Sequence, residues 1–569
     1  MFLRTVTTAI FLGTSIFTES ATRNRLRHAD VKIDKICEAS GVPGASIGVI
    51  HHSKVIHTYN YGYSDPKKKL PTNSGTVYGI GSITKSFIAA AIAQLVDENK
   101  LTWDTPIKEI LPQFHHDNKA ITEMMTITDI LSHRCGLSGG GAMNLVFEGD
   151  GDALLSKDKL FELVNHFPIL SPLRQSWNYF VWGYAMAGAI IEKVSKKSLK
   201  DYLSDNIFQP LRMNATSLSP IRQNQGELAE PFAGLSNGSA FHLPKLQAFQ
   251  NTFFEASGGI YSSLDDLMIW VSAILNSTDG TTPTNSSVIK GLPYILSNHI
   301  AIENPSITER SYGLGWVRTQ LPGVVGLIGD NADLWDIDDS PILGVKNKPT
   351  LMIYHQGSTV GYYSFVALFP KTSSAVVVLT NSIALSDAAD WIARTVIQAL
   401  FDFNDGQDYV ALAKEARFRT LAQYKQLDDE IASIRANCSN SASPAPKSFV
   451  GKYINKSRLF SIEILVQPDQ NDHLYLRFQG RKDQTYELRH LCKNIFEWSL
   501  THDEAMKRGR YKNSELSFFL FEFLLDDHGE AVSFSWANNL EMPDLKEVFE
   551  KDKSNLVGVG GLKGQKPIL

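Results

Sequence analysis

A strongly apolar helical stretch follows Ser82. Residues 86–96 read Ser-Phe-Ile-Ala-Ala-Ala-Ile-Ala-Gln-Leu-Val, so nearly every side of a helix would be apolar. Such a helix is typical of the interior of a large core rather than of a surface. Gly79 and Gly81 lie just before it and allow the chain to turn sharply. The pattern therefore predicts a buried helix that is entered through a tight turn at Ser82.

Other patterns predict short elements on both sides of this helix. The segment from Ile127 to Leu137 predicts a helix that ends at Gly136. Two short apolar segments joined at Ser53 and Lys54 predict a hairpin. The other elements expected in this half are a helix at 23–40, strands at 45–50 and 55–61, a glycine-rich loop at 138–152, and helices near 157–165 and 184–195.

Three closely spaced apolar runs lie further along the chain, at 350–355, 361–369 and 375–380, followed by a helical pattern at 384–401. Their polar joints are short, which favours an antiparallel sheet. The two ends of this region supply strands and the middle supplies helices. The predicted fold class is therefore α+β: an antiparallel sheet flanked by helices, with an inserted, mostly helical lobe.

The C-terminal part of the chain changes character. A long helix is expected at 407–436, and a Ser/Ala/Pro-rich stretch at 437–447 is typical of a linker. Beyond it, short strands in sequence predict a small β-barrel or half-barrel; they lie at 460–466, 473–478, 485–489, 495–499, 516–525 and 531–535. The expected organisation is a signal peptide or disordered segment at 1–22, a catalytic domain at 23–404, helix and linker at 405–447, a β domain at 448–552 and a disordered tail at 553–569.

Composition excludes several classes of function. The chain has 569 residues, with 55 Lys and Arg against 60 Asp and Glu, a formal charge of −5 that gives no electrostatic case for nucleic acid. No run of eighteen apolar residues occurs, so no membrane span is expected. The four cysteines, Cys37, Cys135, Cys438 and Cys492, have no metal-ligand spacing and are too few for a disulfide scaffold.

The N-terminus leaves two locations open. Arg4 precedes a short apolar patch that is diluted by threonines, which is compatible with a weak signal peptide. Six glycosylation sequons are also compatible with secretion; they begin at Asn214, Asn237, Asn276, Asn285, Asn437 and Asn455. We expect the secretory pathway, with the cytoplasm as the alternative.

Ser82 and Lys85 form a Ser-x-x-Lys motif at the mouth of the buried helix. Three residues apart, the two side chains lie on one helical face. A lysine held beside a serine in a desolvated pocket can lose its proton and act as a base. The alternative is a serine that caps the helix, followed by an exposed lysine.

Two further segments strengthen the catalytic interpretation. Residues 177–188 run from a loop into a helix and supply Tyr179, and residues 354–362 at a strand end supply His355. The whole pattern resembles the serine β-lactamase and penicillin-binding-protein superfamily, in its class C-like branch of esterases, D-aminopeptidases and transesterases. The resemblance covers about residues 25–402 and rests on Ser82-x-x-Lys85, Leu131-Ser132-His133 with Gly136-Leu137, Gly258-Gly259 with Ser262-Ser263 and Asp266-Leu267, Tyr312-Gly313-Leu314-Gly315-Trp316, and His355-x-Gly357. The tail domain resembles a lipocalin-like module, through residues 449–453 and its strand pattern.

The resemblance implies a role for each matching residue. Ser82 would be the nucleophile, and Lys85 with Tyr179 would share the role of general base. His355 would replace the lysine of the family's Lys-Thr-Gly strand and orient Tyr179 and the substrate. Gly357 would let the substrate pass close to the strand, and the backbone N–H groups of Ser82 and Ser358 would form the oxyanion hole. No metal or organic cofactor is implied, and the partner is a small-molecule acyl substrate; the oligomeric state is left open.

One position departs from the family pattern. Where the family has Tyr-x-Asn, this chain has Tyr179-Phe180-Val181, and valine cannot donate a hydrogen bond to a substrate amide. The sequence therefore favours a serine hydrolase that acts through an acyl-enzyme on an ester, amide or D-amino-acid-type substrate, with an ester or another acyl group favoured over a β-lactam. An acyltransferase or transesterase of natural-product biosynthesis and a catalytically weak binding protein remain alternatives. His133, near the predicted helix end, is interpreted as structural.

Overall fold

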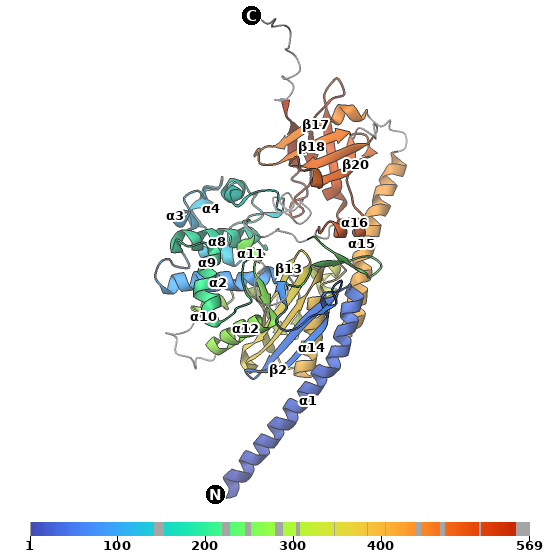
Figure 1. Ribbon diagram of the computed structural model, residues 1–569. Helices are drawn as coiled ribbons and strands as arrows, with labels where there is room; N and C mark the ends of the chain where they lie inside the picture. The colour runs from blue at the N-terminus through green and yellow to red at the C-terminus, as the bar shows by residue number, and fades with distance from the viewer. Residues whose placement is uncertain are drawn as a thin grey trace, which may run out of the picture. The chain divides into compact units, whose positions relative to one another are not determined.

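Strands from both ends of the segment 23–404 join one sheet in the computed structural model. The structure describes residues 2–141, 153–218, 228–244, 252–278, 288–302, 308–345, 347–383, 385–403, 406–438, 445–466, 473–510 and 514–553, apart from the side chains of residues 2–18 and 338. The chain forms two compact units; the first comprises residues 1–139, 151–423 and 502–512, and the second comprises the rest. Figure 1 traces the chain through both units.

The sheet of the first unit has nine strands in the order β3-β2-β1-β15-β14-β13-β10-β9-β8, and its neighbouring strands are antiparallel. Early β1 lies against late β15, with Gly48 opposite Val377. The predicted antiparallel α+β fold is confirmed. The strands are β1 (Gly44–His51), β2 (Lys54–Asp65), β3 (Leu70–Pro71), β8 (Ile300–Ala301), β9 (Arg310–Tyr312), β10 (Val317–Leu321), β13 (Thr350–Thr359), β14 (Tyr362–Phe369) and β15 (Ser374–Thr380).

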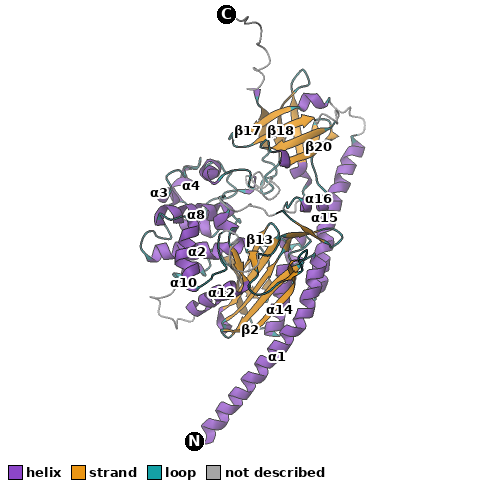
Figure 2. Cartoon of the chain, viewed as in Figure 1, coloured by secondary structure: helices purple, strands orange, loops and turns teal. Residues whose placement is uncertain are grey.

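Helices cover both faces of this sheet (Figure 2). Every residue of β14 and β15 is buried, as expected of central strands with both faces covered. On one face, a Cβ atom added to Gly48 would meet Met268 of α12 (Leu264–Thr278) at 2.8 Å. The helix α14 (Ala388–Phe401) packs on β14 and β15 and against α1 (Phe2–Ser40). In α1 the buried residues recur at helical spacing; they include Leu26, Ala29, Ile33, Ile36 and Cys37.

The inserted lobe is built around α2 (Thr84–Asp97), which packs on α8 (Val181–Ser195) and α11 (Glu255–Gly258). The predicted burial of this helix is correct, because its residues from Thr84 to Leu95 are all buried. The shorter helices are α3 (Ile107–Ile110), α4 (Lys119–Met124), α5 (Ile127–Leu131), α7 (Leu160–Val164), α9 (Leu199–Leu203), α10 (Gln209–Leu211) and α13 (Leu292–Ile295). The first unit also has two strand pairs and a three-stranded sheet. The pairs are β4 (Val77–Gly79) with β7 (Tyr261–Ser263) and β11 (Gly323–Val324) with β12 (Ile342–Leu343); the sheet has the order β16 (Ser382–Ile383), β5 (Phe232–Gly234), β6 (Ala240–His242).

The helix predicted to run from residue 127 to 137 is shorter than expected. It ends at Leu131, and the chain reverses at His133, whose φ is +61°. Gly136 is also left-handed, at φ +72°, and a Cβ atom there would lie 2.2 Å from the carbonyl oxygen of Ser171. The glycine therefore serves a close loop contact rather than a helix end. This reversal directs the backbone carbonyl of His133 away from α5.

The second unit contains a closed antiparallel barrel of eight strands in sequence order. Inward positions alternate with outward ones, and the buried positions hold many aromatic rings. The strands are β17 (Gly451–Asn455), β18 (Ser461–Val466), β19 (Leu474–Phe478), β20 (Thr485–Cys492), β21 (Ile495–Glu497), β22 (Leu520–Leu525), β23 (Ala531–Trp536) and β24 (Glu547–Lys551). The buried rings include Tyr453, Phe478, Trp498, Phe521, Phe523, Phe534, Trp536 and Phe549. The expected small barrel is present and closed.

Two cysteines of the second unit are paired. Cys438 follows the last residue of α15 (Tyr409–Asn437) and forms a disulfide with Cys492 of β20. Cys37 and Cys135 are free and buried. The sequence did not predict this disulfide, because 54 residues separate the two cysteines and no spacing pattern links them. Within the described part of the chain, none of the helices combines the length and hydropathy that crossing a bilayer requires.

Candidate active site

Ser82 lies in the 3-10 turn η1 (Gly81–Ile83), directly before α2, and is half-buried. Gly81 has a φ of +49°, and a Cβ atom there would lie 2.6 Å from the backbone nitrogen of Ser358. An L side chain at this position would be strained and would collide with β13. Because residue 81 is glycine, the turn that carries Ser82 can pack directly against β13. The tight turn was predicted, although Ser82 precedes α2 instead of lying in its first turn.

Lys85 points back at Ser82 from the first turn of α2. Its Nζ lies 2.9 Å from Ser82 Oγ and donates a hydrogen bond of 2.8 Å to the carbonyl oxygen of Ser257. The Lys85 side chain is fully buried. Burial lowers the pKa of Lys85 well below its usual value, because the charged ammonium loses its hydration. The geometry and the lowered pKa make a neutral amine available beside the serine hydroxyl.

Tyr179 approaches the same two residues from the loop before α8. The centre of its ring lies 4.9 Å from Lys85 Nζ. Desolvation raises the pKa of Tyr179, and a hydrogen bond with Ser82 lowers it only in part. The phenol is therefore protonated at neutral pH, so Lys85 is the better proton acceptor and Tyr179 the better donor. Val181, two residues on, is half-buried at the start of α8 and offers no hydrogen-bonding group.

His355 is fully buried in β13, and its ring centre lies 6.4 Å from that of Tyr179. Its Nδ1 lies 2.6 Å from the carbonyl oxygen of Gln356, so Nδ1 carries the proton. Its Nε2 then accepts a hydrogen bond of 2.9 Å from the hydroxyl of Tyr312. Burial, and next the charge of Lys85, lower the pKa of His355 to about 3. His355 is thus a neutral group that holds Tyr312, and its hydrogen bonds do not go to Tyr179.

Gly357 and Ser358 bring β13 against the serine turn. A Cβ atom on Gly357 would lie 2.1 Å from the carbonyl oxygen of Ile80 and 2.3 Å from Ser364 Oγ. Glycine is therefore required here by the packing of the turn on the strand, whereas the sequence suggested space for substrate. The pairing of β13 with β10 ends at Tyr354, and among the described residues no strand pairs with this edge of β13 beyond it. The Ser358 backbone N–H lies at this part of β13, beside Gly81.

Three further groups lie at the site that sequence patterns did not single out as functional. They are the Ser257 carbonyl, the Tyr312 hydroxyl and the ring of Tyr184, which is 5.3 Å from Lys85 Nζ. Ser257 directly precedes the Gly258-Gly259 motif, and Tyr312 opens the Tyr-Gly-Leu-Gly-Trp motif. These two motifs could therefore have pointed to Ser257 and Tyr312 as residues of the site.

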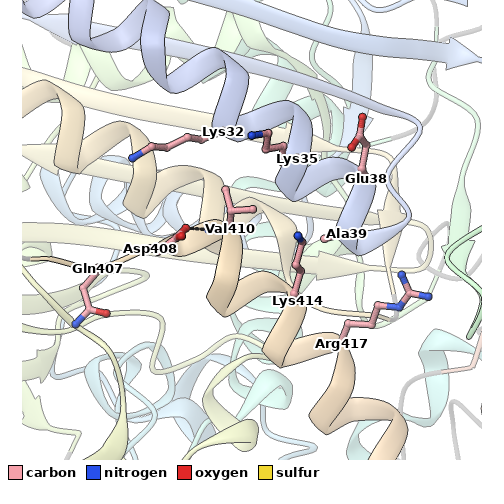
Figure 3. A pocket seen from close by; sticks show the side chains of 9 residues that line it. All are labelled: Lys32, Lys35, Glu38, Ala39, Gln407, Asp408, Val410, Lys414 and Arg417. Atoms are coloured by element: carbon pink, nitrogen blue, oxygen red, sulfur yellow. Dashed lines mark hydrogen bonds between the residues drawn. The ribbon is translucent and has the colours of Figure 1, made fainter.

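A separate cleft of 990 Å³ lies between α1 and α15. Figure 3 shows that Lys32, Lys35 and Glu38 come from α1, opposite Lys414 and Arg417 of α15. None of the predicted site residues lines this cleft. Among the described residues, no group of three His, Cys, Asp or Glu side chains is placed to hold a metal ion.

Comparison with known proteins identifies the family. The family model described as Beta-lactamase matches residues 29–399. The chain belongs to the beta-lactamase family. A second model, described as a domain of unknown function (DUF3471), matches residues 439–551. The predicted superfamily is therefore confirmed, and with it membership of a family of beta-lactamase-fold hydrolases.

Relatives of this beta-lactamase-family chain are distant in sequence. Unguisins hydrolase ungD' of Aspergillus campestris is 25% identical over 466 residues, which cover 78% of each chain. Protein flp of Staphylococcus aureus is 25% identical over 364 residues, which cover 63% of this chain and 64% of flp. The structure of the octameric penicillin-binding protein homologue from Pyrococcus abyssi aligns with a TM-score of 0.53 at 21% identity, over 91% of this chain and 98% of that one. This last likeness supports the fold.

Proposed function

We propose that the protein is a serine hydrolase that forms an acyl-enzyme on Ser82. The observation that carries the proposal is the 2.9 Å contact between Lys85 Nζ and Ser82 Oγ, with the lysine fully buried. Burial favours the neutral amine, which is the form that can accept a proton from the serine. Ser82 itself stays half-buried, so a substrate can reach it.

In the proposed reaction, Lys85 accepts the Ser82 proton while Oγ forms a bond to the acyl carbon of the substrate. The carbonyl becomes an oxyanion that accepts hydrogen bonds from the backbone N–H groups of Ser82 and Ser358; each such donor contributes roughly 3–4 kcal/mol in a comparable enzyme. The oxyanion collapses, the leaving group departs with the proton returned through Lys85 or Tyr179, and the acyl group remains on Ser82. Water then attacks the ester while Lys85 accepts its proton; the bond to Ser82 Oγ breaks, Lys85 returns the proton to Oγ, and the acid is released.

An ester or a weakly polar acyl group is the favoured substrate class. Val181 cannot donate a hydrogen bond to an amide side chain, which argues against a substrate chosen for such a group. Aromatic rings line the loop beside Ser82, with the rings of Trp177 and Tyr179 6.0 Å apart. Support for hydrolysis as the reaction comes from the relative that is named a hydrolase.

The experiment that tests this proposal is the intact mass of the protein after incubation with a panel of p-nitrophenyl esters and a fluorophosphonate. We expect a single covalent adduct whose peptide contains Ser82. Adducts on another residue, or none with any donor, would overturn the proposal. Adding an alcohol or amine acceptor extends the test, because an acyltransferase would yield more ester or amide than free acid.

We also propose that the chain passes through the secretory pathway. The Cys438–Cys492 disulfide is typical of oxidising compartments, and the sequon residues Asn214 and Asn237 are exposed. Asn455 differs: it is 4% exposed and hydrogen-bonded to Glu547, so we expect no glycan there. Protein from its natural host should lose mass on enzymatic deglycosylation, and the Asn455→Gln variant should lose the same amount. An unglycosylated protein with free thiols at both cysteines would contradict this location.

A further inference from the structure

His133 contacts the backbone on both sides of Tyr179. Its carbonyl oxygen accepts a hydrogen bond of 2.9 Å from the N–H of Asn178, and its Nδ1 accepts one of 2.9 Å from the N–H of Phe180. The ring centres of His133 and Tyr179 are 4.4 Å apart. One residue thus holds the backbone N–H groups of the residues on either side of Tyr179 and packs on its ring.

The left-handed backbone of His133 makes this double contact possible. With φ at +61°, the residue turns out of α5, so its carbonyl and its ring both reach the loop that carries Tyr179. A second anchor fixes the same loop further back. Asp129 of α5 pairs with Arg134 at 2.7 Å and with Arg174 at 2.8 Å, and the N–H of Arg174 donates to the carbonyl of Arg134.

Burying the polar ring of His133 costs more free energy than burying an apolar side chain of similar size would. The side chain is fully buried, and because Nδ1 accepts a hydrogen bond, the neutral ring carries its proton on Nε2. That Nε2 has no hydrogen-bond partner among the described residues. An unpaired buried N–H costs free energy that an apolar side chain would avoid. Burial, and next the charges of Lys85 and His355, lower the pKa of His133 well below its usual value, so the ring is neutral.

We propose that His133 is a positioning residue for Tyr179, acting through the two backbone hydrogen bonds and the ring contact. The inference rests on the proposed serine hydrolase function, and it replaces the purely structural interpretation that the sequence favoured. His133 holds the phenol where it meets Ser82 and Lys85 and takes no proton itself. A displacement of about 1 Å at such a group can lower a rate about 100-fold.

The test compares His133→Leu with His133→Asn, alone and combined with Tyr179→Phe. Leucine removes the acceptor for the Phe180 N–H, whereas the asparagine oxygen can replace Nδ1. With p-nitrophenyl acetate, we expect His133→Leu to lower kcat about 100-fold at nearly unchanged KM, and His133→Asn to lose about 10-fold or less. In the Tyr179→Phe background, either His133 substitution should add little further loss, because the phenol that it positions is already gone.

His116 supplies a matched control. It is also buried, and its Nδ1 accepts a backbone hydrogen bond of 2.9 Å from Asn118, but its other nitrogen bonds the carbonyl of Phe167. His116→Leu should affect melting temperature without a comparable loss of kcat. If His133→Leu does not fold, the comparison of His133→Asn alone and combined with Tyr179→Phe tests the inference. Asparagine still lacks the ring that packs on Tyr179, so a loss of kcat that disappears in the Tyr179→Phe background would support it.

Two outcomes would overturn the inference: kcat equal to that of the wild type in His133→Leu, or losses that multiply fully when combined with Tyr179→Phe. Failure of the proposed function looks different. In that case Ser82→Ala would react with the ester as fast as the wild type, whatever the His133 variants do.

Discussion

Ser82→Ala should abolish covalent labelling by a fluorophosphonate and lower kcat/KM on activated esters by at least about 10⁴-fold. The hydroxyl supplies the bond that holds the acyl group, and alanine has no group that could form it; Lys85 Nζ keeps its hydrogen bond to the Ser257 carbonyl in the variant. The remaining activity would come from the oxyanion donors and substrate binding alone. Labelling kinetics and steady-state turnover measure the effect.

Ser86 offers a control on the same helix. It is buried, its Oγ donates to the Ile83 carbonyl and accepts from Trp270 Nε1, and it has no part in the proposed reaction. Ser86→Ala should keep full labelling stoichiometry, even with a lower melting temperature. Equal labelling of the wild type and Ser82→Ala would remove the basis for the acyl-enzyme.

Lys85→Met should lower kcat by about 10²–10⁴-fold, the usual contribution of a general base. Because the neutral amine is the active form, wild-type activity should rise as pH increases through the lowered pKa of Lys85. The variant should lose this rise. A pH series of kcat/KM measures both effects, and Lys197→Met, an exposed lysine paired with Asp205, is the control. A variant that keeps the wild-type rate and pH profile would exclude Lys85 as the base.

Lys85→Met should lower activity but raise the stability of the folded protein near neutral pH. In the unfolded chain a lysine has a pKa of about 10.4, whereas burial lowers the pKa of folded Lys85. Between the two values the unfolded chain binds more protons, so wild-type stability rises with pH over this interval. Lys85→Met lacks this dependence; it should therefore melt at a higher temperature than the wild type near neutral pH, by a margin that shrinks towards pH 10.

Local pattern was sufficient for the elements that carry the nucleophile. The helix after Ser82 and the central strands β14 and β15 are continuous apolar runs because they are buried on all sides, and such runs can be recognised from neighbouring residues. The pairing of His355 with Tyr312 could not be predicted in this way, since the two residues lie 43 positions apart in sequence, on different strands. The early end of α5 was missed because a left-handed histidine has no distinctive sequence signal.

The aromatic interior of the barrel limits what this module can do. Rings such as Phe521 and Phe534 stack at 4.5 Å between centres, and the described strands enclose side chains where hollow barrels enclose a guest. A lipid or similar cargo would have to expel those rings before it could enter. The packed rings therefore leave the outward side chains of the described strands as the part of this module that another molecule could reach.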